Sequence, residues 1–490
     1  NGIGANGSSQ VDEINDINIT GATIKLDGIY NATGITGDAA GITLTGAVQL
    51  AGDVTLDSDS SNDGNISFSS TINDDGSSST TSNLVIKSGT GTVGVTDKIG
   101  AGSSGTLTSL TINASNSYSA SGKITLTEDI GLTSQAGVSG ATKIGNTATT
   151  EIQLGGTLYK TGGAGNSATT YTASSTAADG DGSFDMVAGA DIKFESTDGA
   201  ITFSTGNIEI GADTDITVTS GSGAIAVHGI VGHSYETVTL TSSGTVEIGT
   251  GGIGSGTEIS DVNIDGSTIT LKGDITTAGT GSGNGAAVKG DVDFDGNVEI
   301  DGAVTITTDV TNTANDGVID FGTHTINAEG GGSNTESLTL TSGAGTITLG
   351  TVGGSTGLDS FVVNSSALTI SNDITTVNGL IDINAPVTLG ADVTISSGTG
   401  TGNVEFSSTI AGTQNLDILS GSGAVTITGN IGGGAALTSL DINATGASTG
   451  TGNISILGNI GADGTSGSGV VALGNSNTGT ITFGTSGTES

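Results

Sequence analysis

Closely spaced aspartates are the residues of this chain with the clearest capacity for chemistry. They form two groups, Asp179, Asp181 and Asp185, and Asp291, Asp293 and Asp295. Carboxylates this close raise one another's pKa unless a cation neutralises them, and Ca²⁺ prefers oxygen ligands. Both groups are therefore candidate Ca²⁺ sites on the protein surface. The alternative is an acidic surface that is simply solvated.

The two groups differ in how far they follow the pattern of a calcium site. The first begins like a calcium-binding loop, with Asp-Gly-Asp-Gly from Asp179, but Ala190 occupies the twelfth position, where such a loop has a bidentate Glu. The second alternates with apolar residues, which would place its three carboxylates on one face of a strand. The glycine-rich nonapeptide repeat of calcium-binding β-rolls does not occur in the sequence, so calcium is not expected in every coil.

Other side chains give little support for catalysis. His228 and His233 lie five residues apart, but the chain has no cysteine, so we interpret them as polar residues rather than zinc ligands. Enzymes that cleave polysaccharides need paired acids, or an acid with a basic residue, in a substrate groove that aromatic residues usually line. Arginine and tryptophan are absent and the five tyrosines are scattered. The sequence therefore predicts a protein that is not an enzyme, with a polysaccharide-active enzyme as the weaker alternative.

Charge and composition exclude further classes of protein. Nine lysines against 49 acidic residues give a net charge of −40, which leaves almost nothing to neutralise phosphates, so nucleic acids are excluded as partners. No apolar run approaches the roughly 18 residues that span a bilayer, so no membrane insertion is expected. With 88 Gly and 3% aromatic residues an ordinary compact core is excluded, whereas 33% hydrophobic residues argue against disorder.

A repeated pattern indicates the fold: short runs in which apolar and polar residues alternate are separated by Ser-Gly-x-Gly corners. Its four copies begin at Ile216, Leu84, Leu338 and Leu416. Alternation with a period of two predicts half-buried strands, and Gly-rich corners predict turns. Three copies continue to a further alternation, with spacings of 26, 23 and 24 residues for Leu84 to Leu110, Leu338 to Phe361, and Leu416 to Leu440. The sequence predicts an all-β parallel β-helix with three short strands per coil of about 20–26 residues.

Longer repeats organise these coils. Residues 16–28 return as residues 261–273, and a second motif that begins at Val48 returns at Val298 and Val387. We expect one continuous solenoid over residues 1–490, with supra-repeats at about 16–111, 112–260, 261–361, 362–440 and an incomplete 441–490. The second supra-repeat is the longest, and its Gly, Ser, Thr and Asp-rich stretch 159–185 is expected to protrude, because long loops cost little extra entropy.

The run Leu-Thr-Leu-Thr-Ser-Gly-Ala-Gly-Thr-Ile-Thr-Leu-Gly at 338–350, with Leu-Asp-Ile-Asn-Ala at 440–444, resembles the repeat regions of filamentous haemagglutinin-like bacterial adhesins. The resemblance implies a right-handed β-helical shaft that is secreted and displayed at the cell surface. It is equally compatible with an adhesin shaft and with a sheath or filament subunit.

Two hypotheses about partners follow. Neither end of the sequence shows a charged or helical cap, which predicts stacking on another copy or on neighbouring repeats of a longer chain. We therefore expect a non-enzymatic extracellular structural protein that assembles with itself. The alternative is an adhesin that binds a receptor or surface glycans through residues 159–185.

Overall fold

The computed structural model describes most of the chain as β-strands and turns. Its described residues are 14–33, 39–59, 63–77, 81–102, 105–114, 120–162, 167–175, 183–212, 214–233, 236–255, 259–278, 290–309, 316–330, 335–444, 450–461 and 469–484. The chain divides into two compact units, Asn1–Thr257 and Glu258–Ser490, which we describe separately. No helix in the described residues is long and apolar enough to cross a membrane.

The first unit contains strands β1 to β20. Their bounds are β1 Ile17–Asn31, β2 Ala40–Asp57, β3 Asp63–Phe68, β4 Ile72–Asp74, β5 Asn83–Lys87, β6 Val93–Val95, β7 Ser109–Ile112, β8 Ile124–Leu126, β9 Thr142–Ile144, β10 Ile152–Leu154, β11 Leu158–Thr161, β12 Thr169–Thr172, β13 Phe184–Met186, β14 Ile192–Ser196, β15 Ile201–Ser204, β16 Ile208–Ile210, β17 Ile216–Ser220, β18 Ile225–Val231, β19 Thr237–Ser242 and β20 Thr245–Ile253.

The second unit contains strands β21 to β42. Their bounds are β21 Asp261–Leu271, β22 Ile275–Thr276, β23 Val292–Ile300, β24 Ala303–Thr307, β25 Ile319–Asp320, β26 Ile326–Ala328, β27 Ser337–Gly343, β28 Ile347–Thr348, β29 Ser360–Ser365, β30 Leu368–Ile370, β31 Ile374–Thr375, β32 Ile381–Asn384, β33 Val387–Leu389, β34 Val393–Ser396, β35 Val404–Phe406, β36 Ile410–Ala411, β37 Asn415–Leu419, β38 Val425–Ile427, β39 Ser439–Ile442, β40 Ile454–Ile456, β41 Val470–Leu473 and β42 Ile481–Phe483.

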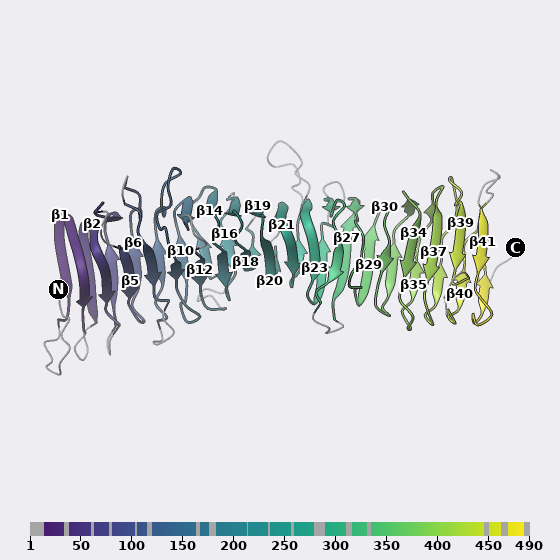
Figure 1. Cartoon of the computed structure of the whole chain (residues 1–490), viewed down its shortest axis with the longest axis horizontal. Helices are drawn as coiled ribbons and strands as arrows, with labels where there is room; N and C mark the ends of the chain where they lie inside the picture. The colour runs from purple at the N-terminus through teal and green to yellow at the C-terminus, as the bar shows by residue number, and fades with distance from the viewer. Residues whose placement is uncertain are drawn as a thin grey trace. The chain divides into compact units, whose positions relative to one another are not determined.

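Each unit is a parallel β-solenoid in which every coil contributes to three series of paired strands. In the first unit these series run through β3, β6, β8, β10 and β13, through β11, β14, β17 and β19, and through β5, β7, β9, β12 and β15. In the second unit they run through β28, β30, β33 and β36, through β31, β34, β37, β39 and β41, and through β29, β32, β35, β38, β40 and β42. Figure 1 shows the coils of each unit following one another.

These pairings confirm the predicted fold class and its registers. Leu84 pairs with Leu110, Leu338 with Phe361, and Leu416 with Leu440, as the spacing of the repeats predicts. Some coils are longer than expected, since Ile152 pairs with Phe184, 32 residues further on. The parallel pairing of β10 with β13 is kept in this longer coil.

The interior of each solenoid is a file of aliphatic and aromatic side chains. Alternate residues of almost every strand point inward, so Leu84 and Ile86 of β5 are buried while Val85 between them is partly exposed. Phenylalanines two residues after a buried Ile or Val, such as Phe68 and Phe406, are also buried. Each fully buried aliphatic side chain contributes about 1.5–3 kcal/mol, and the backbone ladder satisfies the strand N–H and C=O groups.

Each repeated residue of the Ser-Gly-x-Gly corners has a physical role. At Ser420 the backbone N–H of Gly423 donates to the Ser420 carbonyl at 2.8 Å, and Ser420 Oγ donates to the Gly423 carbonyl at 2.8 Å. Gly421 has a φ of 56°, which favours glycine. A Cβ on Gly423 would overlap the carbonyl oxygen of Gly402 on the preceding coil. Glycine therefore serves both the turn and the close approach of coils.

The stretch 159–185 differs from the expected protrusion wherever it is described. Tyr159 of β11 and Tyr171 of β12 are buried in the solenoid interior. Tyr159 stacks on Phe194 with ring centroids 5.0 Å apart, and Tyr171 stacks on Phe203 at 4.8 Å. Both tyrosines occupy inward positions of short strands that the surrounding Gly, Ser and Thr conceal in the sequence. Residues 163–166 and 176–182 lie outside the described residues.

Candidate functional site

The first aspartate group is only partly described. Asp179 and Asp181 lie outside the described residues. Asp185 lies on β13, in register with Gln153 of one neighbouring coil and Glu209 of the other. The structure therefore places Asp185 in a row of outward polar side chains, and the calcium loop from Asp179 stays a prediction.

The second group is spread over several coils. Asp293 and Asp295 both face outward on β23. Asp293 is in register with Asp320 of the next coil, and Asp295 with Asp265 of the preceding one. The side chain of Asp291 has a different role, because its Oδ1 accepts the backbone N–H of Val318 at 2.7 Å. The carboxylates thus form rows along the solenoid rather than a ring around one point.

Burial and the nearby carboxylates raise the pKa of aspartates in these rows. Burial and the neighbouring carboxylates of Asp320 and Asp291 raise the pKa of Asp293. Burial and Asp295 likewise raise the pKa of Asp265. Within the part of the chain that the structure describes, no group of three or more His, Cys, Asp or Glu is arranged to hold a metal ion. The Ca²⁺ hypothesis stays a prediction that a binding experiment must test.

Most described aspartates and asparagines at the corners have a structural role. We call them cross-coil acceptors, because a side-chain oxygen of each accepts a backbone N–H from the next coil. Asp63 accepts the N–H of Thr90 at 2.7 Å, and Asp316 accepts that of Ala344 at 2.7 Å. Further cross-coil acceptors are Asp16, Asp53, Asn65, Asn73, Asp129, Asp191, Asp198, Asp215, Asp261, Asp274, Asp291, Asn297, Asn327, Asp373, Asn378, Asp392, Asn403, Asn430 and Asn453.

These hydrogen bonds also change acidity. The side-chain hydrogen bond from Thr81, with further bonds from Asn83, lowers the pKa of Asp53 against the opposing effect of burial. Backbone and side-chain hydrogen bonds from Asn415 lower the pKa of Asp392. Asp53 and Asp392 are therefore held in their charged form, which suits a hydrogen-bond acceptor and not a general acid.

Two segments build the same arrangement of buried polar side chains. We call residues 84–155 the first module and residues 416–484 the second module. In the first, Asn113 Oδ1 accepts the N–H of Ser88 at 2.9 Å and its Nδ2 donates to Ser88 Oγ at 2.9 Å. In the second, Asn443 makes the same two bonds to Ser420, at 3.0 and 2.9 Å. Both asparagines have positive φ, 50° and 53°.

One coil later, a second asparagine continues each stack. Asn146 Nδ2 donates to the carbonyl of Asn113 at 2.5 Å, and Asn475 Nδ2 donates to the carbonyl of Asn443 at 2.8 Å. Each module thus contains a continuous file of Ser, Asn and Asn at one corner, which is buried except at the half-buried Asn475. Because every member is hydrogen-bonded, the file fixes how successive coils align.

Six described lysines of the first unit, Lys25, Lys87, Lys98, Lys123, Lys160 and Lys193, pair with acids, mostly on neighbouring coils. Lys98 Nζ lies 2.6 Å from Asp129 Oδ2, and Lys123 Nζ lies 2.5 Å from Glu151 Oε1. Burial alone would raise the pKa of Asp129, but hydrogen bonds from Lys98 and from the backbone of the next coil lower it. The same hydrogen bond raises the pKa of Lys98. A lysine held in its charged form is a poor general base.

The histidines do not form a joint site in the described residues. His228 Nδ1 lies 2.9 Å from Asn207 Oδ1, and the backbone N–H of His233 donates to Glu236 at 2.9 Å. His324 Nε2 lies 3.0 Å from Asp295 Oδ1. His228 and His324 thus each have a polar side-chain neighbour of their own, and the interpretation of His228 and His233 as polar residues stays a prediction.

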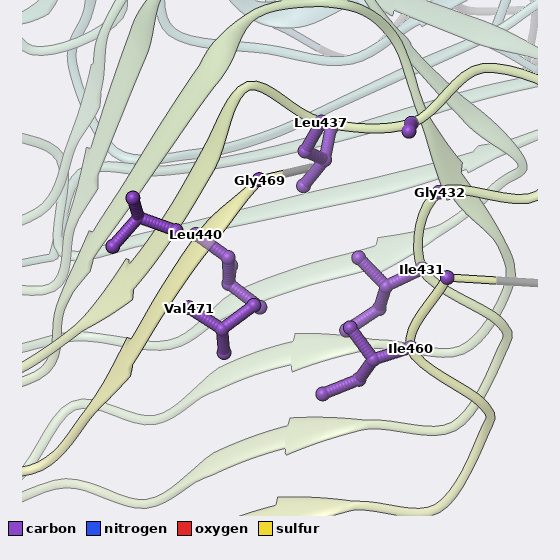
Figure 2. Close-up of a pocket in the computed structure, with 10 residues that line it drawn as sticks. Ile431, Gly432, Leu437, Leu440, Ile460, Gly469 and Val471 are labelled. Atoms are coloured by element: carbon purple, nitrogen blue, oxygen red, sulfur yellow. The ribbon is translucent and has the colours of Figure 1, made fainter. Parts of the chain in front are cut away.

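Two clefts are present in the second unit. One, of about 160 Å³, is lined by Ala328, Glu329, Gly330, Glu336, Thr356, Gly357, Asp359 and Val377. The other, of about 110 Å³, is apolar and is lined by Ile431, Gly432, Ala436, Leu437, Leu440, Ile460, Gly461, Gly469, Val470 and Val471. Figure 2 shows Leu440 and Val471 on one side of this apolar cleft and Ile431 and Ile460 on the other. Its lining has no acid, base or nucleophile, so it is suited to packing rather than catalysis.

Sequence reasoning missed the cross-coil acceptors and both clefts. A signal for the acceptors exists, since many of them stand just before the first apolar residue of a strand, as Asp373 stands before Ile374. Comparison with protein-family models, curated proteins and solved structures finds no match to this chain. The class that the geometry defines is a parallel β-solenoid, and the likeness to haemagglutinin-like adhesins rests on the sequence pattern alone.

Proposed function

We propose that the protein is a non-enzymatic structural protein of the cell exterior, whose solenoid serves as a shaft or filament subunit. One observation carries this proposal: most described aspartates and asparagines at the corners form hydrogen bonds between coils. Asp63 and Asp316 each accept a backbone N–H of the next coil, and Asn443 bonds the buried Ser420. Such side chains are committed to stacking, which is what a shaft requires.

Two further features support the exterior location. The repeat pattern is similar to that of secreted bacterial surface proteins, and the chain contains no cysteine that a changing redox environment could oxidise. The charge of −40 keeps copies soluble and apart over most of their surface. Partners of a shaft are further copies or neighbouring repeats rather than small substrates.

The test measures stability and binding in parallel. Asp316→Ala should lower the thermal midpoint because it leaves the N–H of Ala344 without its acceptor, while Asp382→Ala, at an outward strand position, should change it little. A glycan array and hydrolysis assays on acidic polysaccharides should give no signal for either variant or for the unmodified chain.

Replacement of residues 163–166 and 176–182 by Gly-Ser segments of equal length separates the adhesin alternative. Glycan binding by the unmodified chain that disappears in this variant would establish an adhesin and reject the shaft. Polysaccharide turnover by the unmodified chain would reject the non-enzymatic proposal. Electron microscopy of the same samples then distinguishes long filaments from separate particles.

A further inference from the structure

Several asparagines of the chain stand in the sequence Asn-x-Ser/Thr, which is the acceptor sequence for N-linked sugars. They are Asn6, Asn18, Asn31, Asn65, Asn113, Asn364, Asn443 and Asn453. Asn6 lies outside the described residues, and Asn18 and Asn31 lie on β1, which has a described coil on one side only. The structure distinguishes among the other five, because a sugar replaces a hydrogen of Nδ2 and therefore needs an Nδ2 that solvent reaches.

Three of these five asparagines have a side-chain amide that the fold already uses. Asn113 and Asn443 are 3% and 0% exposed, and the Nδ2 of each donates to the Oγ of a buried serine at 2.9 Å. Asn364 is half-buried, and its Nδ2 donates to Thr341 Oγ1 at 3.3 Å. A sugar has no room at the two buried positions, and at Asn364 it would compete with this hydrogen bond.

Asn65 and Asn453 hold only one end of the side-chain amide. Both are exposed, and both stand just before the first buried residue of a strand. Asn65 Oδ1 accepts the N–H of Thr92 at 2.8 Å, and Asn453 Oδ1 accepts that of Thr480 at 2.8 Å. Within the described residues, no group is hydrogen-bonded to the Nδ2 of either asparagine. The oxygen therefore orients the side chain and leaves the nitrogen available.

The hydroxyl of each acceptor sequence lies on the same face as its asparagine. Burial alternates along β3, so Asn65 and Ser67 face outward on either side of the buried Ile66. Ser455 stands in the same relation to Asn453 in and before β40. Residues i and i+2 of a strand share a face. An enzyme that recognises both the amide and the hydroxyl therefore finds both on the outer side of the solenoid.

The neighbouring coils leave space beside both asparagines. Strand register places Gly41 on the coil before Asn65, and Ala424 on the coil before Asn453. A threonine stands at the same place on each following coil. These small side chains do not cover the amide, so an attached sugar can extend outward from the corner.

Asn403 shows the same corner without the acceptor sequence. Its Oδ1 accepts the backbone N–H of Ala424 at 2.9 Å, which is the cross-coil bond that Asn65 and Asn453 also make. Glu405 stands where the acceptor sequence has Ser or Thr, and its Oε1 accepts a hydrogen bond from Asn403 Nδ2 at 3.2 Å. The chain thus contains an internal control in which the cross-coil bond is kept and the nitrogen is occupied.

We propose that Asn65 and Asn453 are sites of N-linked glycosylation. The donor is a sugar activated as a phosphate ester, and the transferase belongs to the cell that makes the protein. In the transfer, Nδ2 loses one proton and forms a bond to the anomeric carbon of the sugar. The bond from that carbon to the phosphate oxygen breaks, and the phosphate leaves with the electron pair. Oδ1 takes no part, so each asparagine continues to accept its N–H from the next coil.

Mass spectrometry of the chain isolated from the cells that produce it tests the proposal. Peptides that contain Asn65 and Asn453 should carry a sugar, and fragmentation should place it on these asparagines. Peptides that contain Asn113, Asn403 and Asn443 should carry none. A single hexose at each site would support the proposal with a nucleotide-activated donor, and a whole oligosaccharide would support it with a lipid-linked donor.

Substitutions at the hydroxyl separate the acceptor sequence from the cross-coil bond. Ser67→Ala should abolish the sugar on Asn65, while Ser67→Thr should retain it, because threonine also completes the acceptor sequence. Neither substitution removes the acceptor of the Thr92 N–H. Hydrogen exchange at this N–H should therefore be equal in the sugar-bearing chain and in Ser67→Ala.

Unmodified Asn65 and Asn453 in the chain from its producing cells would overturn the proposal. Sugars on Asn113 or Asn443 would overturn the selection of sites by the fold. Faster exchange of the Thr92 N–H in the sugar-bearing chain would contradict a geometry in which only Nδ2 is modified. The proposal goes beyond the shaft function and does not depend on it, so none of these results decides whether the chain is a shaft.

Discussion

The first and second modules build the same three coils from residues that agree at the corners and differ elsewhere. Ser88 and Asn113 in one occupy the positions of Ser420 and Asn443 in the other, with hydrogen bonds of matching length. The outward positions are free to change, since Val85 of β5 corresponds to Asp417 of β37. The repeated feature is therefore the geometry of the corner and not the chemistry of the surface.

At a second corner, the same two positions of each module are joined by an ion pair in one module and by an uncharged hydrogen bond in the other. In the first module Lys98 forms an ion pair with Asp129 at 2.6 Å. In the second, Asn430 and Asn459 stand at these positions, and Asn430 Oδ1 accepts the N–H of Asn459 at 2.9 Å. Charge is thus one of two ways to hold neighbouring coils together, which gives the modules different expected responses to pH.

The largest expected effect comes from removing the close approach of coils. Gly91→Ala and Gly423→Ala should each lower the local opening free energy of their module by at least about 4 kcal/mol, because the added Cβ would overlap a backbone carbonyl of the preceding coil. Gly94→Ala is the control, since a Cβ there meets no atom within 4 Å. Native-state hydrogen exchange measures the opening of each module. Equal tolerance of all three substitutions would contradict the packing argument.

Loss of the buried asparagine should lower the local opening free energy of either module by about 2–3 kcal/mol. Asn113→Ala and Asn443→Ala each remove two hydrogen bonds to a buried serine. Each also places alanine at a positive φ, which alanine tolerates less well than asparagine does. Asn→Gly at the same positions keeps the backbone conformation, so it separates the backbone cost from the hydrogen bonds. Hydrogen exchange of the Ser88 and Ser420 corners is the measurement. A much smaller cost in the second module would mean that its corner is already open.

Much of this comparison could be predicted from the sequence, because a period of two and a glycine corner are local signals. They were sufficient for the pairing of Leu84 with Leu110 and of Leu416 with Leu440. The role of Asp291 was not predictable in the same way, since its partner Val318 lies 27 residues away and is set by the coil register. Local spacing alone grouped Asp291 with Asp293 and Asp295 as metal ligands. Tyr171 was missed because polar residues flank a strand of only four residues.

The modules should respond to acid with opposite signs. Because the pKa of Asp129 is lowered, its ion pair with Lys98 stabilises the fold at pH values above the ordinary aspartate pKa of about 3.9. This contribution is lost as the pH falls through the pKa of Asp129 in the folded protein. Burial and the carboxylates of Asp441, Asp392 and Asp373 raise the pKa of Asp417, so protonation of Asp417 stabilises the fold as pH falls through the raised value.

Two matched substitutions isolate these charges. Asp129→Asn should lower stability at pH 7, and Asp417→Asn should raise it, each by about 0.5–1 kcal/mol, because Lys98 and Asp417 are partly exposed and solvent screens their charges. Both differences should vanish at a pH low enough to protonate the aspartate in the unmodified chain. Urea midpoints from pH 2 to pH 7, followed by circular dichroism, give the comparison. Shifts of the same sign for the two variants at pH 7 would refute it.

The smallest expected effect concerns calcium, and it compares the row of Asp293 and Asp320 with the row of Asp417 and Asp441 in the second module. Both pairs are in register on neighbouring coils, and burial and neighbouring carboxylates raise the pKa of Asp293 and of Asp417, but only Asp293 belongs to the Ca²⁺ site that the sequence predicts. If a cation relieves this repulsion, Ca²⁺ at a concentration equal to its dissociation constant should stabilise the second unit by about 0.4 kcal/mol. The increase in thermal midpoint should disappear with a chelator and in Asp293→Asn, and persist in Asp417→Asn. Identical midpoints with and without calcium would reject the metal site and leave the acidic rows as solvated surface.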